Sequence, residues 1–421
     1  MTAETTSRRA WWIGVVAGMA SYIDAAAIVS SGIGLVLYQI SFGLTELQFG
    51  ALSAALTLGV AIGAIVGGRL GDRFGRRSVF VITMAMIVIG SAVLVFSTSF
   101  VPLLIGILLV GLGTGADLPV SLATIAEAAT DRNRGKLIGF SQILWYGGIL
   151  ATVSISTGVG GMGQLGGQIL FAHVGVVALI ILLLRLSIPE SRVWRDAHTA
   201  SLSVVSGEDA PVSRLRTILT DRRLAFPFFA LLVFYTLVNL AANTTGQFGT
   251  YVAVNVVGIS VQTNSLINLL TLPVGILLGF WFMRIVDGPR RMAYYAFGAI
   301  ASTLGLAAPA IFGFSLLTLV LIYVGAAIGG SFAFEAIMKV WTQESFPTLL
   351  RASAQGSIIA VARLVAAGVA LVTPMLLGAA QLAYGGLAIV VAIGYLVAWF
   401  AFRKRPVPAV AAEKTAFSDV A

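Results

Sequence analysis

Cysteine is absent from this chain of 421 residues, histidine occurs only at His173 and His198, and charged residues make up only 10%. Without cysteine, the chain can form no disulfide and has no thiol chemistry. Two histidines far apart in the sequence argue against a histidine metal cluster, so no metal site is predicted. A soluble domain carries about a quarter charged residues, so the scarcity of charge excludes an ordinary soluble protein.

Apolar residues dominate instead, with 58% hydrophobic residues and a mean hydropathy of +0.98. Runs long enough to cross a bilayer, about 20 residues each, recur along nearly the whole chain. The sequence therefore predicts an all-α membrane protein with twelve transmembrane helices. The expected spans are 11–36, 47–68, 78–97, 100–128, 137–158, 164–187, 224–256, 263–284, 291–313, 315–343, 352–378 and 381–402.

The formal net charge of +9 could suggest a nucleic-acid partner, but the distribution of the basic residues argues against one. With the N-terminus inside, all lysines and arginines except Arg363 lie in or beside the predicted cytosolic segments, as the positive-inside rule requires. Both termini are therefore expected in the cytoplasm and the protein in the inner, or plasma, membrane. The first apolar run is too long for a cleaved signal peptide.

The two halves of the chain repeat one pattern of charges. Glu127 precedes Arg134 by seven residues after the fourth predicted span, and Glu344 precedes Arg351 by seven after the tenth. We therefore predict an internal repeat, with the binding site near the membrane midplane where the halves meet. The predicted parts are an N-terminal six-helix half (1–189), a cytosolic connector (190–223), a C-terminal six-helix half (224–402) and a cytosolic tail (403–421).

The decapeptide GRLGDRFGRR at 68–77 lies between two apolar runs. It resembles the loop between helices 2 and 3 of major facilitator superfamily transporters. The segment 344–351 resembles the end of helix 10 in sugar porters, and 189–194 resembles their signature after helix 6 without its second proline. The segment 113–119 instead resembles helix 4 of proton symporters for aromatic acids and niacin.

This resemblance implies two six-helix halves that work by alternating access. It also implies that charged residues at the cytosolic ends act as a latch in the outward-facing state. The residues expected to form this latch are Asp72, Arg73, Arg76, Glu127, Arg134, Glu344 and Arg351.

Four charged residues are predicted near the middle of the membrane: Asp24, Asp117, Glu335 and Arg363. Such residues are costly and usually functional. Asp24 is the first candidate for the proton carrier, followed by Asp117 and then Glu335. The alternative for either aspartate is a permanent structural contact with serines or an arginine.

Arg363 keeps its charge and needs an anion, for which Glu335 is the expected resting partner. If that partner is exchanged, Arg363 could bind a substrate carboxylate. Lys339 is expected to reach the cytosolic surface.

A second polar feature is a row of amides in the seventh span. Asn239, Asn243 and Gln247 lie at i, i+4 and i+8, so they share one helix face. Amides donate and accept hydrogen bonds, which suits a ligand rich in hydroxyl groups. Gln142 and Trp145 in the fifth span are further candidate substrate contacts. The alternatives are contacts between helices for the amides and core packing for tryptophans such as Trp145 and Trp341.

Together these features predict a secondary transporter, most simply a proton-coupled symporter of a sugar or polyol, acting as a monomer. The expected partners are a small-molecule substrate, protons and the lipid bilayer. An organic-acid symporter using Arg363 is an alternative, as are a multidrug or metabolite exporter and a non-transporting sensor. No enzyme is predicted, because the sequence shows no nucleotide loop or nucleophile with a base. No cofactor is expected, and the proton gradient would supply the energy.

Overall fold

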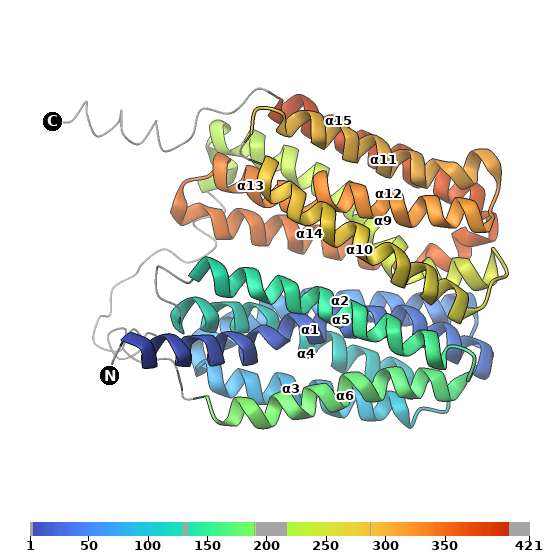
Figure 1. Cartoon of the computed structure of the whole chain (residues 1–421), viewed down its shortest axis with the longest axis horizontal. Helices are drawn as coiled ribbons and strands as arrows, with labels where there is room; N and C mark the ends of the chain where they lie inside the picture. The colour runs from blue at the N-terminus through green and yellow to red at the C-terminus, as the bar shows by residue number, and fades with distance from the viewer. Residues whose placement is uncertain (1–2, 129–133, 189, 191–216, 287, 404–421) are drawn as a thin grey trace. The chain divides into compact units, whose positions relative to one another are not determined.

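The computed structural model describes residues 3–128, 134–188, 190, 217–286 and 288–403, and it is built from helices in these ranges (Figure 1). The first group is α1 (Ala3–Phe42), α2 (Glu46–Phe74), α3 (Arg76–Val95), α4 (Phe100–Ala128), α5 (Arg134–Val159) and α6 (Gln164–Leu186). The second group is α9 (Arg222–Asn255), α10 (Val261–Ile285), α11 (Arg291–Phe312), α12 (Leu316–Phe332), α13 (Glu335–Ser345), α14 (Thr348–Leu376), the short 3₁₀ turn η1 (Leu377–Ala379) and α15 (Ala380–Phe402).

The prediction of an all-α membrane protein is confirmed, and each expected span coincides with one of these helices or with the pair α12 and α13. In the described residues, ten helical segments are long and apolar enough to cross a membrane. One of them, Ala354–Phe402, joins α14, η1 and α15 and so holds two of the expected spans. In α5, the shorter apolar segment Ile143–Val159 corresponds to most of the fifth span.

The contacts divide the chain into two compact units. Unit 1 comprises Met1–Ser206, Gly246–Leu269 and Ala367–Met375, and unit 2 comprises Gly207–Thr245, Leu270–Ala366 and Leu376–Ala421. Helices α9, α10 and α14 therefore each contribute residues to both units. Most of the connector predicted at 190–223 and nearly all of the tail predicted at 403–421 lie outside the described residues.

Within unit 1, α2 and α4 approach so closely that their backbones touch. A Cβ atom added to Gly63 would lie 2.4 Å from the carbonyl oxygen of Leu112, and one added to Gly115 would lie 2.2 Å from the carbonyl oxygen of Val60. Glycines on α2 recur every fourth residue at Gly59, Gly63 and Gly67, so they form one stripe along the helix. Small residues at this spacing let helices pack closely in a membrane, where packing rather than the hydrophobic effect drives association.

The turn between α2 and α3 lies within the decapeptide at 68–77 and consists of one residue, Gly75. Its φ of 91° is a left-handed conformation that other residues rarely adopt. This turn lets α3 begin at Arg76 directly after α2 ends at Phe74. The short connection places the arginines of the decapeptide at the ends of two helices.

Large apolar side chains cover the outward-facing sides of many helices. Leu183 on α6, Leu277 on α10 and Leu382 on α15 are 60%, 68% and 78% exposed. Exposed apolar residues in such numbers are unfavourable in water and are expected where lipid is the solvent.

The tenth expected span, 315–343, is not one continuous helix. It breaks at Ala333 and Phe334, between α12 and α13. Two glycines, Gly329 and Gly330, weaken the helix just before the break, and Phe334 leaves helical geometry with φ −128° and ψ −118°. The Phe334 ring stacks on Tyr235 of α9 with ring centres 5.2 Å apart and nearly parallel planes, which holds the break in place.

Candidate functional site

Asp24 lies in the middle of α1 and is 4% exposed. The indole Nε1 of Trp145 on α5 donates a hydrogen bond to its Oδ2 over 3.3 Å. Asp24 is thus a buried carboxylate in the middle of a membrane-spanning helix, which keeps it a candidate for the proton carrier.

Asp117 on α4 has a different environment. It is 1% exposed and forms an ion pair with Nη1 of Arg185, which lies in the last turn of α6. The hydroxyls of Thr83 and Ser121 donate hydrogen bonds to its two oxygens over 3.1 and 3.2 Å. Asp117 therefore fits the alternative of a permanent structural contact with hydroxyl groups and an arginine.

Arg185 itself is buried and joins four helices. Its Nη2 donates to the hydroxyl of Ser121 over 2.9 Å and to the backbone carbonyl of Ala17 over 3.3 Å. Its guanidinium lies over the ring of Phe80 on α3, 4.3 Å from the ring centre. Sequence reasoning missed this role, because an arginine near the cytosolic end of a span looks like a positive-inside residue. The signal that could have found it is the tilt of helical side chains toward the N-terminus, which directs Arg185 into the membrane.

His173 on α6 makes a packing contact with α1. Its Nε2 lies 2.9 Å from the hydroxyl of Tyr22, and the two rings meet edge to face. Tyr22 and Asp24 therefore tie α1 to α6 and α5 respectively.

In unit 2, Glu335 and Arg363 do not form the expected ion pair. Glu335 begins α13 and pairs instead with Lys339, one turn later, over 2.6 Å. Glu335 is the first residue of α13, and Lys339 lies at i+4 on the same helix, a spacing that favours an ion pair. In the described part of the chain, no ion pair involves Arg363. Glu335 and Arg363 nevertheless both lie near enough to Tyr235 for their charges to act on its hydroxyl group.

The three amides of α9 do not have equal surroundings. Gln247 is buried, and its Nε2 donates to the hydroxyl of Thr57 on α2 over 2.6 Å, within unit 1. Asn239 and Asn243 belong to unit 2 and are half-buried. Gln247 therefore fits the alternative of a contact between helices, while Asn239 and Asn243 remain candidate ligand contacts.

The two candidate tryptophans, Trp145 and Trp341, also differ in their surroundings. Trp145 is half-buried, bonds to Asp24 and meets Tyr146 edge to face. Trp341 is fully buried and stacks on Phe402 with ring centres 4.6 Å apart, which confirms the core-packing interpretation. The side chain of Gln142 lies outside the described residues.

Three of the expected latch residues, Arg76, Glu127 and Glu344, form ion pairs inside their own units, and the partner of Glu344 is Arg291, which is not among the expected latch residues. In unit 1, Arg76 of α3 binds Glu127 of α4 over 2.9 Å. In unit 2, Arg291 of α11 binds Glu344 of α13 through both carboxylate oxygens, over 2.6 and 3.1 Å. The two arginines begin α3 and α11, and the two glutamates lie near the ends of α4 and α13.

The remaining latch candidates have other contacts. Arg73 is exposed and lies over the ring of Phe74, and Nε of Arg351 donates to the carbonyl of Phe346 over 2.9 Å. The side chains of Asp72 and Arg134 lie outside the described residues.

Glu190 adds a contact that the sequence did not reveal. Its two oxygens accept hydrogen bonds from the backbone N–H groups of Arg76 and Arg77, over 2.9 and 3.1 Å. These N–H groups are the first of α3, where a carboxylate also benefits from the helix dipole. Glu190 therefore fixes the segment after α6 to the decapeptide.

The described residues contain no group of three or more potential metal ligands.

A family model described as the Major Facilitator Superfamily matches residues 11–374. A minor myo-inositol transporter of Bacillus subtilis, IolF, is 32% identical over 373 residues, which cover 86% of this chain and 83% of that protein. An inner membrane metabolite transport protein of Escherichia coli, YgcS, is 28% identical over 411 residues, covering 90% of this chain and 89% of its own. The crystal structure of a D-xylose–proton symporter superposes with a TM-score of 0.74 at 20% identity, over 94% of this chain and 98% of that one.

Proposed function

The chain belongs to the major facilitator superfamily, and from this membership we propose that it carries a cyclic polyol or sugar across the membrane together with a proton. It is a multi-pass membrane transporter of a small molecule and not an enzyme. The similarity to a myo-inositol transporter over 86% of the chain supports the substrate class. The half-buried amides Asn239 and Asn243 support it as well, since such groups bind uncharged hydroxyls.

Proton coupling is proposed on the surroundings of Asp24. This carboxyl group is buried in the middle of α1 and accepts a hydrogen bond from the indole of Trp145 on α5, whereas Asp117 forms an ion pair with Arg185. Asp24 is therefore the better carrier of a proton that is bound and released in each cycle.

The position of the basic residues supports a place in the inner membrane with both termini in the cytoplasm. We further propose that the monomer is the functional unit, with no cofactor. Arg76–Glu127 and Arg291–Glu344 would stabilise the cytosolic ends during the cycle.

The test is uptake of radiolabelled myo-inositol into proteoliposomes that contain the purified protein, with an inwardly directed proton gradient. The proposal predicts accumulation that a protonophore collapses. Replacement of Asn239 by leucine should raise the KM for the polyol. Asn255→Leu is the matched control, because this amide lies at the end of the same helix and bonds to the backbone carbonyl of Tyr251. Failure to transport any polyol or sugar would overturn the proposal.

A second candidate is a proton-coupled carrier of an organic acid, favoured by one observation. Arg363 has no ion pair in the described part of the chain and so could take a substrate carboxylate. In the same assay, such a carrier would accumulate a carboxylate and lose its binding in Arg363→Gln. A polyol carrier would keep measurable binding in that variant.

A further inference from the structure

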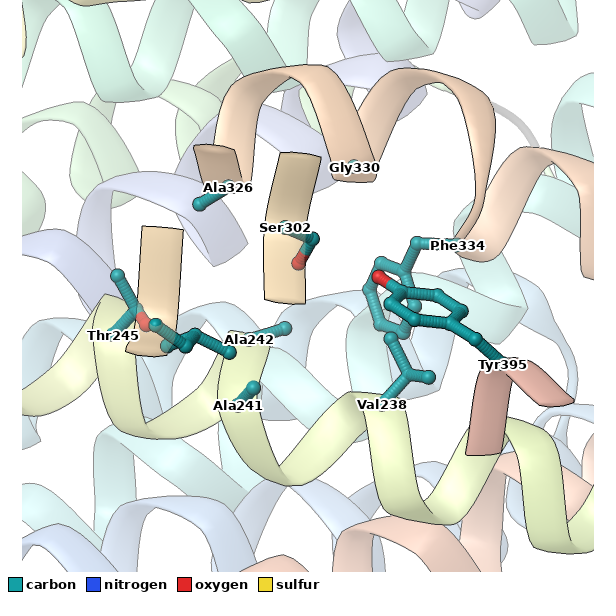
Figure 2. A pocket seen from close by; sticks show the side chains of 10 residues that line it. Val238, Ala241, Ala242, Thr245, Ser302, Ala326, Gly330, Phe334 and Tyr395 are labelled. Carbon is teal, nitrogen blue, oxygen red and sulfur yellow. The ribbon is translucent and has the colours of Figure 1, made fainter. Parts of the chain in front are cut away.

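A crevice enters unit 2 between α9 and α12 and ends against α11 and α15 (Figure 2). Its volume is about 40 Å³, more than the roughly 10–15 Å³ that one water molecule needs. The α9 residues that line it follow helical spacing, so they form a face different from that of Asn239 and Asn243. The lining residues are Val238, Ala241, Ala242, Thr245, Ser302, Leu306, Ala326, Gly330, Phe334 and Tyr395.

The crevice has a distinct mouth and floor. Ala242, Ala326 and Gly330 at the mouth are exposed, whereas Ser302 and Tyr395 at the floor are 8% and 4% exposed. A Cβ atom added to Gly330 would meet no other atom within 4 Å, which shows open space there. The cavity is therefore an entry into the helix bundle rather than a sealed void.

The mouth differs from the surfaces of unit 2 that carry large apolar side chains. Helices α10 and α11 expose residues such as Leu277, Phe280 and Ile300. At the mouth the exposed residues are alanines and a glycine, with the half-buried hydroxyl of Thr245 beside them. The mouth is thus bordered by small and polar residues rather than by the large apolar side chains that cover α10 and α11.

Hydroxyl groups provide the chemistry of the floor. In Figure 2 the hydroxyl of Tyr395 points toward the side of the crevice that Ser302 occupies, and both residues line the crevice. Each hydroxyl can donate one hydrogen bond and accept others, so the pair retains capacity for a further partner. No residue of the lining is charged. The matching ligand group is therefore small, uncharged and hydroxyl-bearing, and the ring of Phe334 gives one apolar wall.

We propose that this crevice is a specificity pocket that binds one hydroxyl-bearing part of the transported polyol. Ser302 and Tyr395 would recognise that hydroxyl group through hydrogen bonds. This inference rests on the proposed function and adds to it the part of the protein that distinguishes one polyol from its deoxy or epimeric analogue. A site that hydrogen-bonds a substrate hydroxyl rejects an analogue without it, because the buried hydroxyls then lose their partner.

The first test is competition of single-position deoxy analogues and epimers against radiolabelled myo-inositol in proteoliposomes. The wild type should bind the analogue altered at one position about tenfold or more weaker than the parent. Ser302→Ala and Tyr395→Phe should reduce this ratio toward one, for that analogue alone. Thr303→Ala is the matched control, since its hydroxyl bonds to the carbonyl of Ala299 on the same helix and lies outside the crevice. Equal losses for all analogues, or unchanged ratios, would overturn the proposal.

The second test measures directly whether the mouth is open to water and whether substrate covers it. Because the chain has no cysteine, Ala326→Cys gives a single thiol at the mouth. We expect this thiol to react with a hydrophilic maleimide and to be protected by saturating myo-inositol. Ile300→Cys, at a residue 59% exposed on α11, is the control and should react slowly with or without substrate.

The outcomes separate the two proposals. An unreactive Ala326→Cys would show that the crevice does not meet water, which overturns the pocket even if polyol is transported. A reactive thiol that a transported polyol fails to protect would also overturn it. If wild-type protein transports no polyol, the proposed function fails first, and the polyol pocket fails with it.

Discussion

At the scale of single residues, two buried aspartates in one unit have opposite surroundings. Asp117 is neutralised by Arg185 and accepts hydrogen bonds from Thr83 and Ser121, whereas Asp24 has the indole of Trp145. We therefore expect Asp117 to stabilise the bundle, and we propose that Asp24 exchanges the proton.

The Asp117–Arg185 pair leads to a prediction about stability. Asp117→Asn or Arg185→Gln alone should destabilise the protein by about 3–5 kcal/mol, because each leaves a buried charge without its partner. The double variant should recover most of this loss and keep proton-coupled uptake. Thermal unfolding in detergent, followed by uptake assays, measures both effects. A stable double variant that transports without proton coupling would instead make Asp117 part of the coupling machinery.

Much of the candidate site could be predicted at this scale, because a charge inside an apolar run stands out. Asp24, Asp117, Glu335 and Arg363 were all found in this way. Their partners could not be found, since pairing depends on which helices are neighbours and where side chains point. Arg185 lies beside a predicted cytosolic segment but pairs inside the bundle with Asp117, and Glu335 pairs with Lys339 rather than with Arg363.

At the scale of elements, close helix contacts depend on particular glycines. On α2, Gly63 faces the backbone of α4, where an added Cβ would lie 2.4 Å from the carbonyl oxygen of Leu112. On the same helix, Gly68 has no atom within 4 Å of an added Cβ. The sequence shows both glycines, but it does not tell which of them touches a neighbour.

Alanine substitutions at these two glycines should therefore have opposite effects. Gly68→Ala should be neutral or stabilise by up to about 1 kcal/mol, since alanine favours the helix. Gly63→Ala should destabilise by about 1–3 kcal/mol, because α2 and α4 must move apart to admit the methyl group. Thermal unfolding of both variants in one detergent gives the comparison. Equal stability would show that the contact between α2 and α4 does not restrict this position.

The break between α12 and α13 could not be predicted from the apolar run that indicates the span. A run of apolar residues fixes where a span lies, so residues 315–343 were found. The interruption depends on the stacking of Phe334 on Tyr235 from a helix distant in the sequence. Local composition carries only a weak sign of it, the pair Gly329–Gly330.

At the scale of the whole molecule, the repeat predicted from charge spacing has a structural counterpart. Arg76–Glu127 and Arg291–Glu344 join corresponding helices in the two units. The division at 189 and 224 was read from the polarity of loops and stays a prediction. The compact units follow contacts instead, and these divide α9, α10 and α14 along their length, since the two ends of a long helix can meet different neighbours.

Because the ion pairs Arg76–Glu127 and Arg291–Glu344 correspond to each other, we expect the loss of either to have the same effect on transport. Glu127→Gln and Glu344→Gln should each reduce accumulation of substrate severalfold without loss of folded protein, because each weakens a charged contact at a helix end. Glu46→Gln is the control, since this exposed residue in the first turn of α2 forms none of the described ion pairs. Initial uptake rates and size-exclusion profiles of the three variants provide the test. Unchanged accumulation in both pair variants would contradict a role in the transport cycle.

The most direct test of proton-coupled transport compares Asp24→Asn with wild type in two assays on the same proteoliposomes. Counterflow exchange of radiolabelled myo-inositol needs substrate movement only, whereas accumulation against a gradient needs proton coupling. We predict that Asp24→Asn keeps exchange and loses proton-driven accumulation. Accumulation equal to wild type in Asp24→Asn would contradict the assignment of the coupled proton to Asp24.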